Sequence, residues 1–207
     1  MENTAQKTEV KLDATFKLDF KALLAVSHAM STEKTRYYLC GIYVEPIVGG
    51  DTKYTATNGH LLIQTLGNSF NEDGNEQKPN FTPFIIPADA VKKVIKAVKS
   101  YKRQNVTVIL NDLNGGKYSV TVQDDVIGFT AIDGTFPDVE RVKPSGFAAI
   151  ESIGVNGDYI GTLDQAARDF MGTKTAALKL RFTTPESPIE ITLRTPGFYA
   201  VLMPMRV

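Results

Sequence analysis

The sequence predicts an α+β fold built from repeated β-α-β-β-β units, and three observations support this prediction. Apolar residues recur at helical spacing in three separate segments, which begin near Asp19, Asp89 and Gly157. Each segment is followed by short runs rich in β-branched and aromatic residues, which are typical of strands. The order of elements is the same after each start, so the unit recurs about every 70 residues.

The composition is that of a globular protein with few reactive side chains. Of the 207 residues 43% are hydrophobic, and 23 basic residues balance 23 acidic ones, so the net charge gives no general attraction to nucleic acid or membranes. A single cysteine, Cys40, excludes an intramolecular disulfide, and with only two histidines it leaves little for a zinc site. No apolar run approaches a membrane span and no signal peptide is recognisable. We therefore expect a cytoplasmic protein with no membrane segment, no metal and no cofactor.

The first unit is expected to contain a strand near Phe16, a helix that ends near Met30, and three further strands at 37–44, 53–57 and 60–66. Between the last two strands lies Asn58-Gly59, and such a pair between strand-forming residues is the strongest short signal for a hairpin with a two-residue turn. On its own it indicates a surface hairpin and nothing more.

The second and third units follow the same order. After a polar stretch at 68–82, which we interpret as an exposed linker, residues 84–86 predict a strand and Pro87 the entry to a helix. Asn156 is a suitable cap for the third helix. The strands expected after these two helices cover residues 106–110, 117–122 and 126–131, and then 176–183, 189–194 and 199–205.

Four ordered stretches carry a resemblance to a known family: Arg36-Tyr37-Tyr38-Leu39, Thr57-Asn58-Gly59-His60, Phe136-Pro137-Asp138 and Met203-Pro204-Met205-Arg206. In this order they resemble the bacterial beta sliding clamp, the beta subunit of DNA polymerase III, in a shortened form. The resemblance implies the DNA-clamp fold with about one and a half clamp domains. Residues 14–145 resemble the central clamp domain, and residues 146–207 resemble the second half of the C-terminal clamp domain.

Basic residues gather on the second predicted helix. Four of them fall within about 60° on a helical wheel and two flank them. A solvated amphipathic helix would show the same pattern. The resemblance implies instead that this helix faces DNA, where exposed lysines can contact phosphates without reading bases. The residues are Lys92, Lys93, Lys96, Lys99, Lys102 and Arg103.

The resemblance also implies a pocket for partner peptides. On the residues alone, 199–205 is more simply a final strand and His60 a structural histidine. Two positions depart from the family pattern, because Leu61 stands where arginine is usual and Pro188 where a small polar residue is common, so we expect a more apolar rim. The expected pocket residues are Leu39, Thr57, Gly59, His60, Leu61, Leu62, Pro137, Arg141, Val142, Pro188, Val201, Met203, Pro204 and Met205.

These inferences predict a non-enzymatic sliding clamp that encircles duplex DNA and tethers a DNA polymerase or another DNA-processing factor. Its expected partners are duplex DNA, a protein with a clamp-binding motif, a clamp loader and further copies of itself; twelve helices in a ring would require about four chains. The alternative is a clamp-like adapter or decoy that binds such peptides without encircling DNA. An enzyme is the weakest alternative, because no nucleophile motif, glycine-rich phosphate loop or metal-ligand spacing is present in the sequence.

Overall fold

The structure is a computed structural model, and it describes residues 14–47, 51–68, 81–101 and 107–206. Its elements follow the predicted order in the first two units, whereas the third unit has only an isolated bridge, between Gly154 and Met205, in place of a leading strand. They are β1 (Ala14–Lys17), α1 (Phe20–Ser27), the 3-10 helix η1 (Lys34–Leu39), β2 (Gly41–Pro46), β3 (Asp51–Thr57), β4 (Leu61–Asn68), β5 (Phe84–Pro87), α2 (Ala88–Ser100), β6 (Val108–Asp112), β7 (Lys117–Val122), β8 (Asp125–Thr130), the 3-10 helix η2 (Val139–Val142), α3 (Gly157–Met171), β9 (Lys179–Arg181), β10 (Ile189–Thr192) and β11 (Phe198–Leu202).

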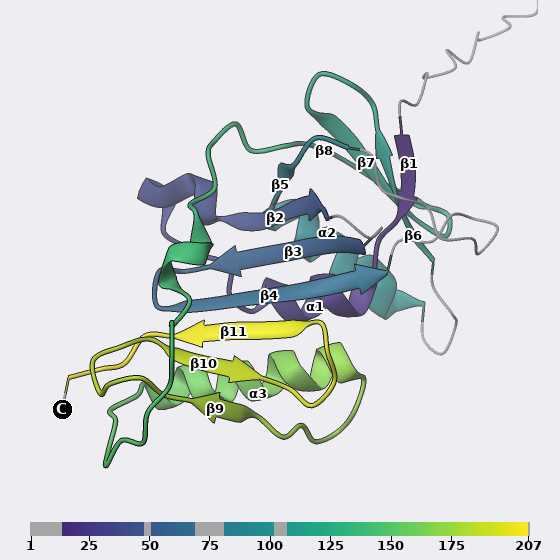
Figure 1. The fold of residues 1–207 in the computed structure, drawn as a ribbon. Helices are drawn as coiled ribbons and strands as arrows, with labels where there is room; N and C mark the ends of the chain where they lie inside the picture. The colour runs from purple at the N-terminus through teal and green to yellow at the C-terminus, as the bar shows by residue number, and fades with distance from the viewer. Residues whose placement is uncertain (1–13, 48–50, 69–80, 102–106, 207) are drawn as a thin grey trace, which may run out of the picture.

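The strands form two antiparallel sheets, with the orders β1-β6-β7-β8 and β5-β2-β3-β4-β11-β10-β9 (Figure 1). The leading strand of each of the first two units pairs with the other unit: β1 with β6, and β5 with β2. This exchange ties the first two units together. The third unit extends the larger sheet, because β11 pairs with β4 and places Val201 opposite Leu62. One sheet therefore continues across the predicted boundary near residue 145.

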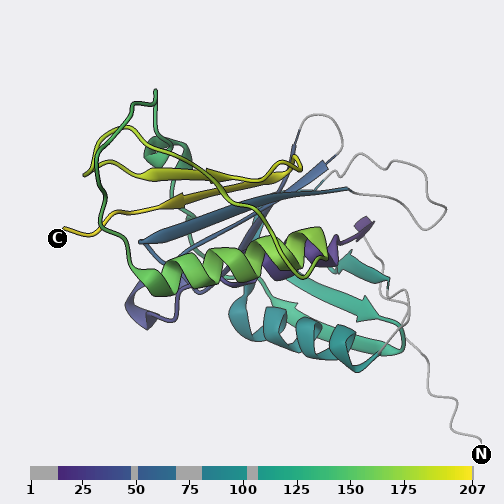
Figure 2. The same cartoon turned by 90° about the horizontal axis from the view of Figure 1, so that it is seen from below.

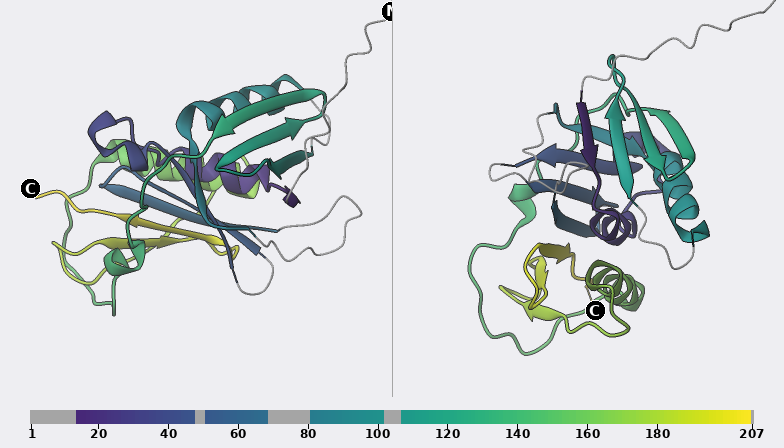
Figure 3. Two further views of the ribbon diagram at one scale, coloured as in Figure 1. Left: turned by 90° about the horizontal axis from the view of Figure 1, so that it is seen from above. Right: turned by 90° about the vertical axis from the view of Figure 1, so that its right-hand side faces the viewer.

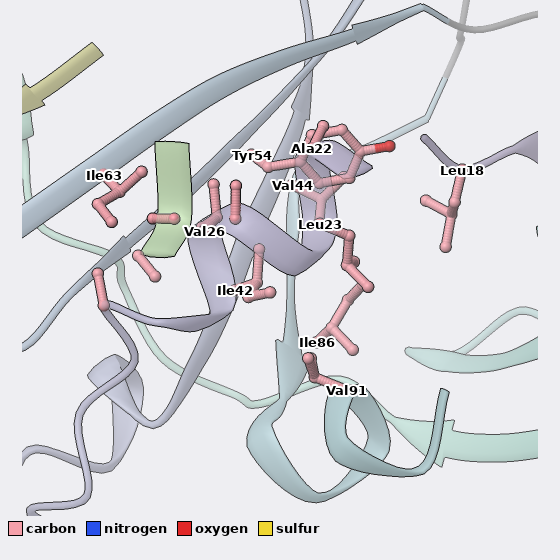
Figure 4. Close-up of a cluster of buried hydrophobic side chains, with 14 of the residues drawn as sticks. Leu18, Ala22, Leu23, Val26, Ile42, Val44, Tyr54, Ile63, Ile86 and Val91 are labelled. Carbon is pink, nitrogen blue, oxygen red and sulfur yellow. The ribbon is translucent and has the colours of Figure 1, made fainter. Parts of the chain in front are cut away.

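All three helices lie on one side of the sheets, and η2 lies on the opposite side (Figures 2 and 3). The core fills the space between helices and strands: Leu23 of α1, Ile42 of β2, Ile86 of β5 and Val91 of α2 are all at most 1% exposed (Figure 4). Burying each such side chain stabilises the fold by roughly 1.5–3 kcal/mol. The helices thus have one face fixed in the core and one face free for contacts outside the chain.

Local hydrogen bonds define where the helices begin. The Asp19 carboxylate accepts a hydrogen bond from Ala22 N at 3.1 Å, and the Asn156 amide oxygen accepts one from Asp158 N at 2.9 Å. These caps satisfy backbone donors that a helix start leaves free. The third helix ends at Met171 and is capped by Gly172, whose φ of 67° is a conformation that favours glycine.

Several predicted boundaries are wrong. The first helix ends at Ser27 and not near Met30, and the strand expected at 37–44 begins only at Gly41. The residues before it form η1, because Ser31 N bonds to Leu39 O at 3.1 Å and folds this segment back on itself. The strand predicted at 176–183 covers only Lys179–Arg181 (β9). The strand predicted at 106–110 covers Val108–Asp112 (β6), and residue 106 lies outside the described residues.

Candidate functional site

A pocket of about 240 Å³ lies beside the junction of β4 and β11. Four separate segments supply its walls: η1, the β3–β4 hairpin, the linker around η2 and the end of β11. Its lining is mainly apolar with a few polar groups, which is typical of binding sites for small molecules and short peptides. The lining residues are Arg36, Tyr38, Leu39, Thr57, Gly59, His60, Leu61, Leu62, Pro137, Asp138, Val139, Val142, Val201 and Met203.

The β3–β4 hairpin is held by its own side chains. Thr57 Oγ1 accepts a hydrogen bond from Gly59 N at 3.1 Å, and Asn58 Oδ1 accepts bonds from the backbone N–H groups of His60 and Leu61 at 2.9 Å each. Three residues, 58–60, separate the two strands, so the predicted two-residue turn is wrong. Among these three residues only Gly59 has a positive φ, of 91°. A side chain at Gly59 would also meet the Arg36 guanidinium. The hairpin is therefore a fixed wall that presents His60.

The charged residues Arg36 and Asp138 line the pocket, and each pairs with a residue outside the lining. Arg36 Nε donates to Glu33 Oε2 at 2.8 Å, and this hydrogen bond lowers the pKa of the Glu33 carboxyl. Asp138 accepts a hydrogen bond from Arg141 Nε at 3.1 Å. The His60 ring stacks on Tyr159 of α3, with ring centroids 6.1 Å apart. The rim therefore has no excess of one charge, and His60 links it to the third unit.

The C-terminal wall is fixed to both neighbouring segments. Met203 N donates to His60 O at 2.8 Å, and Met205 N donates to Gly154 O at 2.9 Å. Val201 is 2% exposed and its cross-strand partner Leu62 is 3% exposed, so both form the pocket floor. Val201 and Met203 thus make the end of β11 a structural part of the pocket.

Most of the residues predicted for the pocket line it, but four of them do not. Arg141 points toward Asp138, Met205 is bonded to Gly154, and neither Pro188 nor Pro204 reaches the lining. Leu61 is 1% exposed and packs in the hydrophobic core, so its side chain lies on the face of β4 opposite to Leu62. The prediction missed Arg36, Tyr38, Asp138 and Val139. These four lie within or beside the quoted motifs, so sequence neighbourhood could have found them.

The helix-lined side carries the predicted basic cluster. Lys92, Lys93, Lys96 and Lys99 are exposed on α2, whereas Lys102 and Arg103 lie outside the described residues. No ion pair involves any of the four lysines in the part of the chain that the structure describes. The face of α2 is therefore positively charged.

Two acidic groups of α3 pair with basic side chains. Asp164 pairs with Arg168 at 3.0 Å, and Asp169 lies 2.8 Å from His28 of α1. The described residues contain no group of three His, Cys, Asp or Glu that could hold a metal ion. Within the same residues, no helix is long and apolar enough to cross a membrane.

Comparison with known proteins identifies the family. Residues 17–138 match the family model of the DNA polymerase III beta subunit, central domain. The beta sliding clamp of Caulobacter vibrioides is 35% identical over 127 residues, which cover 59% of this chain and 31% of that protein. The beta sliding clamp of Pseudomonas aeruginosa is 28% identical over 122 residues, 58% of this chain and 30% of that protein. The chain thus matches less than a third of the length of these relatives.

Solved structures extend the likeness of the fold to nearly the whole chain. The sliding clamp of Bartonella birtlesii bound to griselimycin has a TM-score of 0.75 at 21% identity and covers 99% of this chain and 70% of its own. The Caulobacter crescentus pol III beta structure has a TM-score of 0.73 at 21% identity and covers 97% and 68%. The predicted α+β clamp fold is confirmed. With its match over residues 17–138, the chain belongs to the family of the DNA polymerase III beta subunit.

Proposed function

We propose that the chain works as a DNA sliding clamp, which encloses duplex DNA and tethers a DNA polymerase or another DNA-processing factor through the pocket. The observation that carries the proposal is the combination of family membership with a preformed pocket made by four segments. The mechanism requires no chemical step. Enclosure keeps the protein on DNA while weak phosphate contacts allow it to slide.

The pocket suits a short linear motif of the Gln-Leu-x-Leu-Phe kind. The leucine and phenylalanine of such a peptide would enter the apolar floor, and the polar end would lie near His60. Each buried anchor contributes roughly 1.5–3 kcal/mol. After the cost of ordering the peptide, we expect a Kd of about 1 μM. The apolar residues that would receive the anchors are Leu39, Leu62, Val142, Val201 and Met203.

The helix-lined side is the surface that would face DNA. Its exposed lysines on α2 carry no competing carboxylate partner among the described residues, so they remain available to phosphates. The proposed site at this surface consists of Lys92, Lys93, Lys96 and Lys99, together with Lys102 and Arg103, which lie outside the described residues.

Enclosure of DNA would require several copies of the chain, and we propose a ring of about four. The apolar face of α3 gives no basis for self-association, because Leu163, Ala166 and Ala167 are 0% exposed. The free edges of the two sheets are a better argument for self-association. The strand β8 ends one sheet and exposes 68% of Val126, and β9 ends the other sheet.

A peptide titration tests the central proposal. A labelled peptide with the Gln-Leu-x-Leu-Phe motif should bind with a Kd of about 1 μM, and a peptide with both anchors changed to alanine should bind at least about 100-fold more weakly. Equal binding of the two peptides would refute the pocket. Light scattering at micromolar concentration tests the ring separately, because a monomer alone would exclude it. A monomer that still binds the peptide would instead fit the adapter.

A further inference from the structure

One wall of the pocket comes from the linker between β8 and α3, and this wall has no buried residue of its own. Pro137 and Val142 line the pocket from the linker, and η2 contains no buried residue. Across the described residues, no backbone hydrogen bond joins residues 133–145 to either sheet. Side-chain contacts must therefore hold this wall beside the hairpin.

The first contact is an aromatic stack directly before the wall. The Phe136 ring lies on the Tyr43 ring of β2, with centroids 5.0 Å apart and planes 4° apart. Just before it, the chain passes close to η1, because a Cβ at Gly134 would lie only 3.0 Å from the Cβ of Tyr38. Aromatic pairs in such contact add stability beyond the burial of their surface. The start of the wall is therefore fixed to the sheet.

The second contact is a cation over an aromatic ring directly after the wall. Lys143 Nζ lies 4.9 Å from the centroid of the Tyr199 ring in β11, and it also pairs with Glu140 Oε1 at 2.7 Å. The Tyr199 hydroxyl is hydrogen-bonded to Glu190, a carboxylate in a residue that is 6% exposed and that also binds Arg181. The ring under Lys143 is thus held by the neighbouring strands.

We propose that Phe136 and Lys143 are positioning residues of the peptide pocket. Neither side chain lines the pocket, yet together they hold the Pro137–Val142 wall in place from its two ends. The inference rests on the proposed peptide-binding function. A preorganised wall spares the peptide the cost of ordering it. If the wall were loose, only the fraction of molecules with the wall in place would bind, and the Kd would rise by the inverse of that fraction.

The test uses the full chain with Phe136→Leu, Lys143→Met and the double variant. These changes keep apolar volume but remove the ring stack and the charge. Backbone ¹⁵N relaxation should show order parameters for residues 139–142 that fall from about 0.85 to below about 0.6 in the double variant. The Kd of the labelled peptide should rise about threefold in each single variant and about tenfold in the double variant.

Phe147→Leu is the matched control. The Phe147 ring also covers a cation, with the Arg181 guanidinium 3.9 Å from its centroid. Here, however, Ala148 N donates to Phe182 O at 2.8 Å and fixes the linker through its backbone. The control should therefore leave the order parameters unchanged and the Kd unchanged within about twofold.

The two measurements separate this inference from the proposed function. Unchanged order parameters in the double variant would overturn the anchoring, whatever happens to the peptide. A loosened wall with an unchanged Kd would overturn the positioning role. If the unmodified chain fails to bind the peptide, the proposed function fails and the positioning role falls with it, while relaxation still decides whether the two contacts hold the wall.

Discussion

Replacing Lys92, Lys96 and Lys99 by alanine should weaken the binding of duplex DNA and flatten its salt dependence. The three side chains are exposed on α2, and no carboxylate competes for them among the described residues. Alanine favours the helix at least as well as lysine does, so the fold should persist. The effect therefore isolates the contribution of charge to DNA binding.

The magnitude follows from counterion release. Each phosphate neutralised by a lysine contributes about 0.9 to the slope of log K against log salt concentration, so three lysines contribute about 2.7. Between about 50 and about 200 mM salt, the unmodified chain should lose about 40-fold more affinity than the variant does. Fluorescence anisotropy of a labelled duplex at several salt concentrations measures both slopes, and circular dichroism checks the fold.

Lys117→Ala with Lys179→Ala provides the control. Both lysines are exposed, Lys117 on β7 and Lys179 on β9. Side chains alternate along a strand, and the even-numbered Val120 of β7 and Leu180 of β9 face the core. The two odd-numbered lysines therefore point to the side away from the helices. This pair should leave the slope nearly unchanged. An unchanged slope in the α2 variant, or equal changes in both variants, would refute the assignment of α2 to the DNA-facing surface.

Three further predictions concern the pocket and the sheet beneath it. Met203→Asp should abolish detectable binding at a peptide concentration of about 100 μM, because the new carboxylate in the pocket would lose its hydration when a peptide binds. Tight peptide binding by this variant would contradict the assignment of the pocket. Gly41→Ala should lower the free energy of unfolding by about 1–3 kcal/mol in a urea titration, since the added Cβ would collide with the backbone carbonyl of Ile86. Burial raises the pKa of Tyr199 from 10.0 to about 12, so at pH values between these two the hydroxyl keeps its proton in the folded state and loses it in the unfolded state. Stability should therefore fall between pH 10 and about 12, and Tyr199→Phe should remove this part of the fall.

Short-range patterns in the sequence predicted most elements but not their partners. The starts of α1 and α3 were predictable because their caps, Asp19 and Asn156, act within three residues. The segment before Gly41 was misread as a strand, because its aromatic residues favour strands while hydrogen bonds to Ser31 favour η1. The exchange of β1 and β5 between sheets depends on contacts distant in sequence, which periodicity does not describe.

The candidate pocket was predictable only through the family resemblance. Its walls come from segments as far apart as Leu39 and Met203, and no spacing rule brings these together. The resemblance supplied those positions but gave no account of what holds them. Phe136 and Lys143 escaped notice because their partners, Tyr43 and Tyr199, lie on strands far away in the sequence. Such contacts become visible only when the strand order is known.

The junction of β4 and β11 connects the two proposed activities. On one side of the sheet it places Val201 beside Leu62 in the pocket floor. On the other side α1 and α3 meet, where His28 lies 2.8 Å from Asp169. The hydrogen bond from Met203 N to His60 O closes the pocket at the same junction. A change that separates β11 from β4 must therefore open the pocket on one side of the sheet and alter the packing of α1 against α3 on the other side. A mutation at this junction should affect both surfaces together.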